Sequence, residues 1–226
     1  MRILLIRGKV MEKSCKAKQL RIFMPLGMVG VVSYFLHILL GNILWKEYNP
    51  IIMDISSLTA TGSPNASLLR VFTVIYGICM ILFVLGMVIK SYREFGLATR
   101  VGYVILLGME FISLFGYSTF PLTGNKTVMN FQNMMHIAVT VSVVFTTIAS
   151  VFTLAYGYLK EEKLKIGKFI LIMAIIITVA GLTNPIGIAM GLNILGLTER
   201  LVIYPLQVLI FTLSYYYTFN LDNNYN

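Results

Sequence analysis

The chain has 226 residues, of which 58% are hydrophobic and 12% are charged, and its formal net charge is +9. Soluble domains are about 45–50% apolar and about 25% charged, so this composition excludes an ordinary water-soluble domain and favours a membrane protein. The basic residues form juxtamembrane clusters that are not interleaved with exposed aromatic residues, which argues against nucleic acid as a partner. They are better explained as topology signals and as contacts with anionic membrane lipids, the expected partners.

Six apolar runs follow a basic tail at residues 1–21. The predicted spans cover residues 22–44, 71–89, 101–120, 134–159, 169–188 and 201–219. Each run is long enough to cross a hydrocarbon core of about 30 Å as a helix that rises about 1.5 Å per residue. Because the backbone must satisfy its own hydrogen bonds in lipid, each run is predicted to be an α-helix. The sequence therefore predicts an all-α integral membrane protein, with a six-helix bundle at residues 22–219 and a short tail at residues 220–226.

The distribution of Lys and Arg predicts the side of the membrane on which each loop lies. Fourteen of the 18 Lys and Arg residues lie in the amino-terminal tail and around the loops that follow the second and fourth spans. The other four lie on the opposite side: Lys46, Arg70, Lys126 and Arg200. Because cytoplasmic loops carry the excess of positive charge, both termini are predicted to be cytoplasmic, in a multi-pass protein of the plasma membrane.

The longest loop joins the first two spans, from Trp45 to Ser67, on the predicted outer side. It combines apolar residues with turn residues, so we expect it to lie on the membrane surface or to fold back into the bundle. Ser63-Pro64 is typical of a helix start, with Ser as the N-cap and Pro at the first helical position. A long loop without clear secondary structure is more often functional than a short one.

Ionisable residues inside spans mark candidate sites, because a charge near the bilayer centre costs about 2.5–3.5 kcal/mol. Glu110 in the third span is the clearest case, and His37 and His136 lie in the first and fourth spans. Three charged residues lie in the outer loop or near the outer ends of spans: Asp54, Arg70 and Arg200. The inner halves of the spans contain almost no ionisable residue, and Tyr215 to Tyr217 are interpreted as an interfacial aromatic belt. This asymmetry predicts a polar pocket in the outer half with Glu110 at its floor; the alternative is a cluster of structural polar residues.

Three functions are compatible with such a pocket. The leading hypothesis is binding of a lipid headgroup or a small polar ligand, with Arg70 and Arg200 on a phosphate. The second is an intramembrane lipid-modifying enzyme that uses Glu110 and His136. The third is a small proton-coupled transporter with Glu110 as its proton site. The chain has no nucleophile or nucleotide motif and lacks the spacing of a zinc site, so no cofactor and no metal are expected.

A homo-oligomer is compatible with the sequence, since Gly187 and Gly191 form a small-residue helix-packing pattern. The segment from Asn49 to Ala66, NPIIMDISSLTATGSPNA, resembles the first outer loop of the prokaryotic family called domain of unknown function 998. Phe120-Pro121 and His136 also match its pattern, over about residues 22–219. The loop is similar in style, more distantly, to the DRAM/Frag/Sfk membrane family. The resemblance implies a six-span membrane bundle without an established activity.

Overall fold

The computed structural model describes residues 20–124 and 130–219. Its elements, in chain order, are α2 (Leu26–Leu44), the 3-10 helix η1 (Ile55–Thr59), α3 (Ala66–Glu94), α4 (Leu97–Thr119), α5 (Phe131–Lys160), α6 (Leu164–Ala189) and α7 (Leu195–Phe219). Six of these helices are long and apolar enough to cross a membrane, so within the described residues the predicted all-α, six-helix architecture is confirmed. Most of the predicted basic tail and the tail at residues 220–226 lie outside the described residues.

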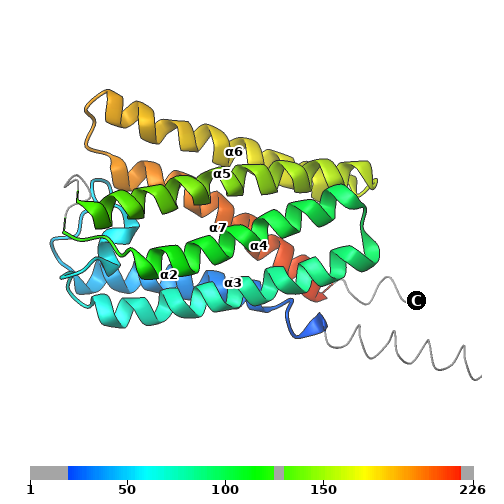
Figure 1. Ribbon diagram of the computed structural model, residues 1–226, viewed down its shortest axis with the longest axis horizontal. Coiled ribbons are helices and arrows are strands. Elements are labelled where there is room, and N and C mark those ends of the chain that lie inside the picture. Colours follow the sequence, from blue (N-terminus) through cyan, green and yellow to red (C-terminus); the bar gives the residue numbers. More distant parts are fainter. Residues whose placement is uncertain (1–19, 125–129, 220–226) are drawn as a thin grey trace, which may run out of the picture.

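The six long helices lie side by side along the long axis of the molecule (Figure 1). Consecutive helices pack against one another, and α2 also packs against α7, which closes the bundle. Helices α2, α4 and α6 end at the end of the bundle where η1 lies, which we call the η1 end; α2 begins and α7 ends at the opposite end (Figure 1). Which end faces the cytoplasm stays the prediction made from the Lys and Arg distribution.

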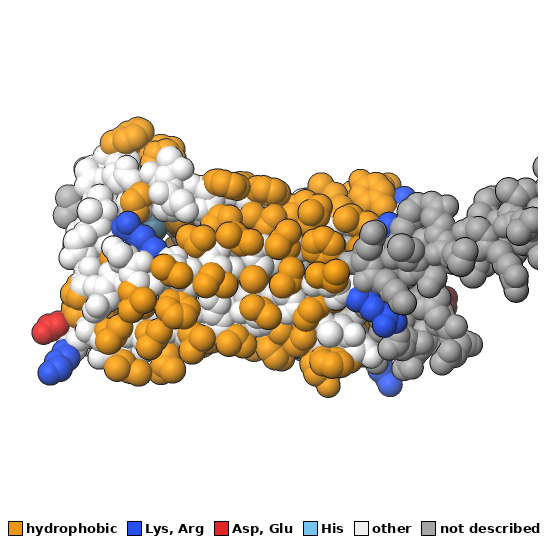
Figure 2. Space-filling model, turned by 90° about the horizontal axis from the view of Figure 1, so that it is seen from below, with side chains coloured by type: hydrophobic (Ala, Val, Ile, Leu, Met, Phe, Trp, Pro, Cys, Tyr) orange, Lys and Arg blue, Asp and Glu red, His pale blue; other side chains and the backbone are white. Residues whose placement is uncertain are grey.

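Apolar side chains cover the long middle part of the face shown in Figure 2, whereas charged side chains lie towards its two ends. Large apolar side chains such as Leu39, Val141 and Val179 are about half exposed on the outside of the bundle. In water such a surface would mark an interaction site, and around six long helices it is the surface that lipid covers. Inside the bundle, the middle is filled by buried apolar side chains that include Phe83 and Leu106.

Two helix starts differ from the prediction for local reasons. The first span was expected from residue 22, but α2 begins at Leu26, directly after Pro25. Proline lacks an N–H donor and its backbone conformation suits a first turn, so it favours the start of a helix. Ser63 is not the N-cap of the second span, because its hydroxyl donates to the carbonyl oxygen of Ser57 (2.6 Å). Helix α3 begins only at Ala66, after Asn65 takes a left-handed backbone conformation (φ 58°).

Candidate functional site

Arg200 joins the first loop to the bundle. Its side chain is buried, and its Nη1 donates to three backbone carbonyl oxygens: those of Pro50 (2.7 Å), Met53 (3.2 Å) and Gly196 (2.8 Å). Its Nη2 donates to the hydroxyl of Tyr48 (2.7 Å), which in turn donates to the carbonyl oxygen of Asp54 (2.8 Å). Hydrogen bonds from a charged group are stronger than neutral ones, so this contact set fixes the loop on α7.

Tyr48 lies outside the spans and keeps its proton at neutral pH. Burial raises the pKa of Tyr48 to about 12, although the hydrogen bond from Arg200 acts in the opposite direction. The neutral hydroxyl can therefore accept from Arg200 and donate to Asp54 at the same time. The loop is thus held by a buried relay of one guanidinium, one phenol and several backbone carbonyls.

Two carboxylates hold η1 in place above the bundle. Asp54 is its N-cap and accepts from the backbone N–H of Ser57 (3.2 Å) and from the hydroxyls of Ser56 (2.8 Å) and Ser57. Glu199 of α7 accepts from the backbone N–H of Ile55 (2.5 Å). Because carboxylates accept hydrogen bonds from both ends of the first turn of η1, this short helix forms a fixed roof over this end of the bundle.

A cavity of about 300 Å³ lies beneath η1, within walls from α2, α3, α4, α5 and α7. This volume is at the lower end of the range for small-molecule sites, about 300–1,000 Å³. Its lining is unusually polar for the interior of an apolar bundle, with side chains that include Tyr34, His37, Tyr76, Tyr117, His136 and Gln207. The cavity is therefore the part of the described chain with the most convergent polar groups.

The predicted site residues divide into three groups. His37, His136 and Arg70 line the cavity, and Arg70 is exposed at its rim, where its Nη2 donates to the carbonyl oxygen of Thr59 (2.9 Å). Asp54 and Arg200 are absent from the lining, since they organise the loop and η1. Glu110 is buried on α4 and is absent from the cavity lining, to which its neighbour in the chain, Met109, belongs. The structure thus brings three of the six predicted residues to one hollow.

Two buried side chains of the lining carry polar atoms that lack a hydrogen-bond partner among the described residues. Both ring nitrogens of His37 and Oε1 of Gln207 are in this state, in side chains that are 2% and 1% exposed. Nε2 of Gln207 donates to the hydroxyl of Tyr76 (2.9 Å), which fixes the orientation of the amide. A buried polar group without a partner costs about 1–3 kcal/mol, so these atoms are available to bind a ligand or water.

His136 is positioned by the start of the fourth predicted span. Its Nδ1 lies 2.8 Å from the carbonyl oxygen of Phe120, and its ring lies 5.0 Å from the ring of Tyr117. A carbonyl oxygen only accepts, so Nδ1 donates and Nε2 is the acceptor nitrogen of the neutral ring. The contact joins Phe120 and His136, two positions at which the sequence resembles the family pattern.

Glu110 and the two histidines do not assemble into a metal site. Within the described ranges no group of three His, Cys, Asp or Glu residues is placed to hold a metal ion. Oε1 of Glu110 has no hydrogen-bond partner among those residues, but the side chain does not reach the cavity that His37 and His136 share. The arrangement therefore supports recognition by hydrogen bonds better than metal chemistry.

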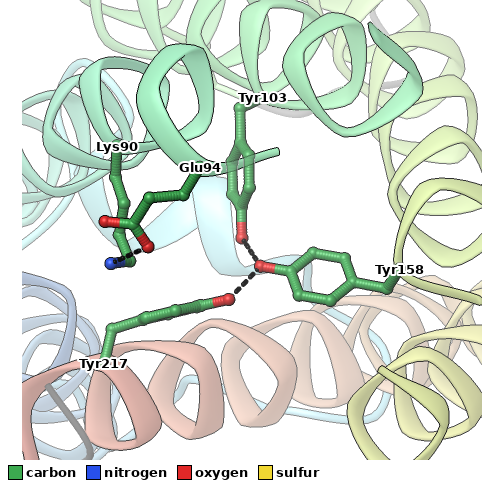
Figure 3. A network of polar contacts seen from close by, with 5 residues as sticks. All are labelled: Lys90, Glu94, Tyr103, Tyr158 and Tyr217. Carbon is green, nitrogen blue, oxygen red and sulfur yellow. Dashed lines mark hydrogen bonds and ion pairs between the residues drawn. The ribbon is translucent and has the colours of Figure 1, made fainter. Parts of the chain in front are cut away.

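A second polar cluster, which we call the tyrosine network, lies at the opposite end of the bundle, near the start of α4 and the ends of α5 and α7 (Figure 1). Figure 3 shows its side chains. The hydroxyl of Tyr158 lies 2.7 Å from that of Tyr103 and 2.5 Å from that of Tyr217, and all three rings are buried. Beside them, Nζ of the buried Lys90 pairs with Glu94 (2.6 Å) and lies 5.5 Å from the ring centroid of Tyr217. One expectation is corrected here: Tyr217 belongs to a network rather than to an interfacial belt. The buried Lys90 lies one residue beyond the predicted second span, within α3.

Gln207 and the tyrosine network were not predicted from the sequence, for the same reason. The candidate residues were charged side chains and histidines inside the spans, and a glutamine or a tyrosine is not conspicuous in an apolar run. Gln207 could have been selected from the sequence, since an amide near the middle of a span is expected to seek a partner inside the bundle. For Tyr103 and Tyr158, the sequence does not distinguish a buried hydrogen-bond network from an interfacial anchor.

The comparisons with known proteins name a family and no activity. A family model described as "Protein of unknown function (DUF998)" matches residues 28–216. No curated protein and no solved structure matches the chain. The matched segment includes the loop with η1, all six long helices in whole or in part, and every lining residue of the cavity. The chain therefore belongs to the DUF998 family, and its six apolar helices fit a multi-span membrane protein.

Proposed function

We propose that this is a plasma-membrane protein that binds a small polar ligand or a lipid headgroup in the cavity beneath η1, which faces the outer side of the membrane. The observation that carries the proposal is the pair of His37 and Gln207, whose buried polar atoms line the cavity without a hydrogen-bond partner among the described residues. Natural proteins pair nearly all their buried polar groups, so an unpaired set around one hollow points to a binding partner.

The lining sets the chemistry of the ligand. Oε1 of Gln207 accepts only, and the ring of His37 offers one donor and one acceptor when neutral. A hydroxyl or amino group on the ligand satisfies both side chains. Arg70 lies at the rim, where its Nε and Nη2 donate to the carbonyl oxygen of Thr59. Its guanidinium has five N–H donors and a positive charge, so it can also bind an anionic group such as a phosphate. Arg200 is not part of this proposal, because its contacts hold the loop.

Native mass spectrometry of the protein in a mild detergent tests the proposal. Wild type is compared with His37→Phe and Gln207→Leu, which keep the approximate volume and remove the polar atoms. The control is Tyr158→Phe, which changes the tyrosine network and leaves the cavity lining intact. We expect one defined small mass on wild type and on the control, and its loss from both cavity variants. A bare protein in every case would contradict ligand binding and assign the unpaired atoms to ordered water.

Glu110 supports a second candidate, a small proton-coupled transporter. Glu110 lies seven residues after Tyr103 on α4, about two helical turns, so its buried carboxyl is on the same face of the helix as this member of the tyrosine network. A pH-dependent flux in proteoliposomes that Glu110→Gln abolishes would support it, and an unchanged flux would exclude Glu110 as the proton site. The lipid-modifying enzyme receives less support, since Glu110 does not share the cavity with His136.

A further inference from the structure

A groove of about 650 Å³ runs along the outside of the bundle between α2 and α7. Its walls are nearly all apolar and include Val32, Leu36, Leu39, Val208 and Phe211, each at least one-third exposed. In a bilayer this surface faces hydrocarbon, so the groove is a place where an acyl chain can lie against protein on two sides.

Gln207 belongs to the walls of both the groove and the cavity. Its side chain is 1% exposed, so it stands between the two hollows rather than on the outside. Neighbouring residues of α2 also face different hollows: His37 lines the cavity, whereas Leu36 and Ile38 line the groove. The polar cavity and the apolar groove therefore lie on two sides of Gln207, which forms part of the wall of each.

We infer that the ligand is an amphiphile whose donor-bearing polar group occupies the cavity and whose hydrocarbon chain lies in the groove between α2 and α7. The inference rests on the proposed function and names its ligand class. The polar group donates a hydroxyl or amino hydrogen to Oε1 of Gln207 and exchanges a second hydrogen bond with His37. A water-soluble ligand would fill the cavity and leave the groove to bulk lipid.

The wall that the two hollows share is what selects this occupant. A single chain fits a groove bounded by two helices, and it lies there against Gln207, the one described side chain that lines both hollows. The polar atom that lacks a partner on Gln207 is thus at the junction where the head of an amphiphile meets its chain. The same placement makes the ligand enter sideways from the membrane, beneath the roof that η1 forms.

Photolabelling of the full-length protein in liposomes tests the inference. The probe is a monoacylglycerol with a diazirine in its chain, because its head carries hydroxyl donors. Val208→Phe fills the groove, and Val141→Phe is the matched control, since the two valines are 48% and 47% exposed and only Val208 lines a groove wall. We expect labels on groove residues of α2 and α7, reduced about tenfold by Val208→Phe and unchanged by Val141→Phe. His37→Phe and Gln207→Leu are expected to reduce the same labels.

The possible failures separate the inference from the proposed function. If Val208→Phe retains the mass that His37→Phe loses in native mass spectrometry, the cavity ligand is water-soluble and the inference is overturned while the proposed function stands. Labels that resist both cavity variants would show a chain in the groove without a head in the cavity, which also overturns it. Crosslinks between two copies across the groove would replace the amphiphile with a protein partner. Neither label nor retained mass in wild type would overturn both.

Discussion

The two ends of the bundle treat buried polar side chains differently. In the tyrosine network each hydroxyl has a hydrogen-bond partner, and Lys90 is paired with Glu94. Beneath η1, His37 and Gln207 present atoms without a hydrogen-bond partner among the described residues, around a cavity. A satisfied network stabilises the packing of helices, whereas an unsatisfied one lowers stability until something binds. The difference separates a structural cluster from a candidate site, although both consist of polar residues inside apolar helices.

The largest expected effect follows from removing the tie between the loop and α7. Arg200→Ala leaves the Tyr48 hydroxyl and several carbonyl oxygens buried without their donor, which should destabilise the protein by about 3 kcal/mol. Thermal unfolding in detergent measures it, and limited proteolysis should cut the loop of η1 first. The control is Arg70→Ala, an exposed arginine of α3 that also donates to a backbone carbonyl oxygen of the first loop, which should cost no more than about 1 kcal/mol. Equal effects of the two substitutions would contradict the role of Arg200.

Alkaline pH should loosen the same tie. The pKa of Tyr48 is raised from 10.0 to about 12 in the folded protein, so the folded state holds this proton where the unfolded state has lost it. The stability that results is complete below pH 10 and declines as the pH rises towards 12, by about 2.7 kcal/mol in total. Unfolding curves from pH 9 to pH 11 should show the decline in wild type and a shallower one in Tyr48→Phe. Identical slopes would contradict a buried, neutral Tyr48.

The tyrosine network should respond as a stabilising element. Tyr158→Phe removes the central hydroxyl and leaves those of Tyr103 and Tyr217 buried without it, which should cost about 1–3 kcal/mol. Tyr156→Phe on the same helix is the control, because Tyr156 is 60% exposed. Thermal unfolding in detergent compares the two. A neutral Tyr158→Phe would show that the network contributes nothing to the packing of α4, α5 and α7.

The cavity should show the smallest effect on stability. His37→Phe removes ring nitrogens that have no hydrogen-bond partner among the described residues, so the ligand-free protein should change by less than about 1 kcal/mol or become more stable. His136→Phe is the contrast, since it breaks the contact with the Phe120 carbonyl oxygen and should destabilise by about 1 kcal/mol. Unfolding of delipidated protein measures both. A strong destabilisation by His37→Phe would mean that His37 is a structural residue.

The sequence predicted what depends on the length and polarity of segments. Six helices follow from six apolar runs, because lipid leaves the backbone no other way to satisfy its hydrogen bonds. It did not predict how far each helix is rotated, and Glu110, which was assigned to the floor of a pocket, is absent from the lining of the cavity beneath η1. The sequence did not predict the role of Arg200 either, because the carbonyl oxygen of Pro50 that accepts its hydrogen bond lies 150 residues away in the chain.

Ligand retention compared between the two polar regions tests the central claim most directly. The measurement is native mass spectrometry of wild type, His37→Phe and Tyr158→Phe, prepared in the same mild detergent. The account predicts that Tyr158→Phe is destabilised yet keeps a defined small mass, whereas His37→Phe is stable and loses it. The opposite pattern, with the mass lost from Tyr158→Phe and kept on His37→Phe, would contradict a ligand site beneath η1.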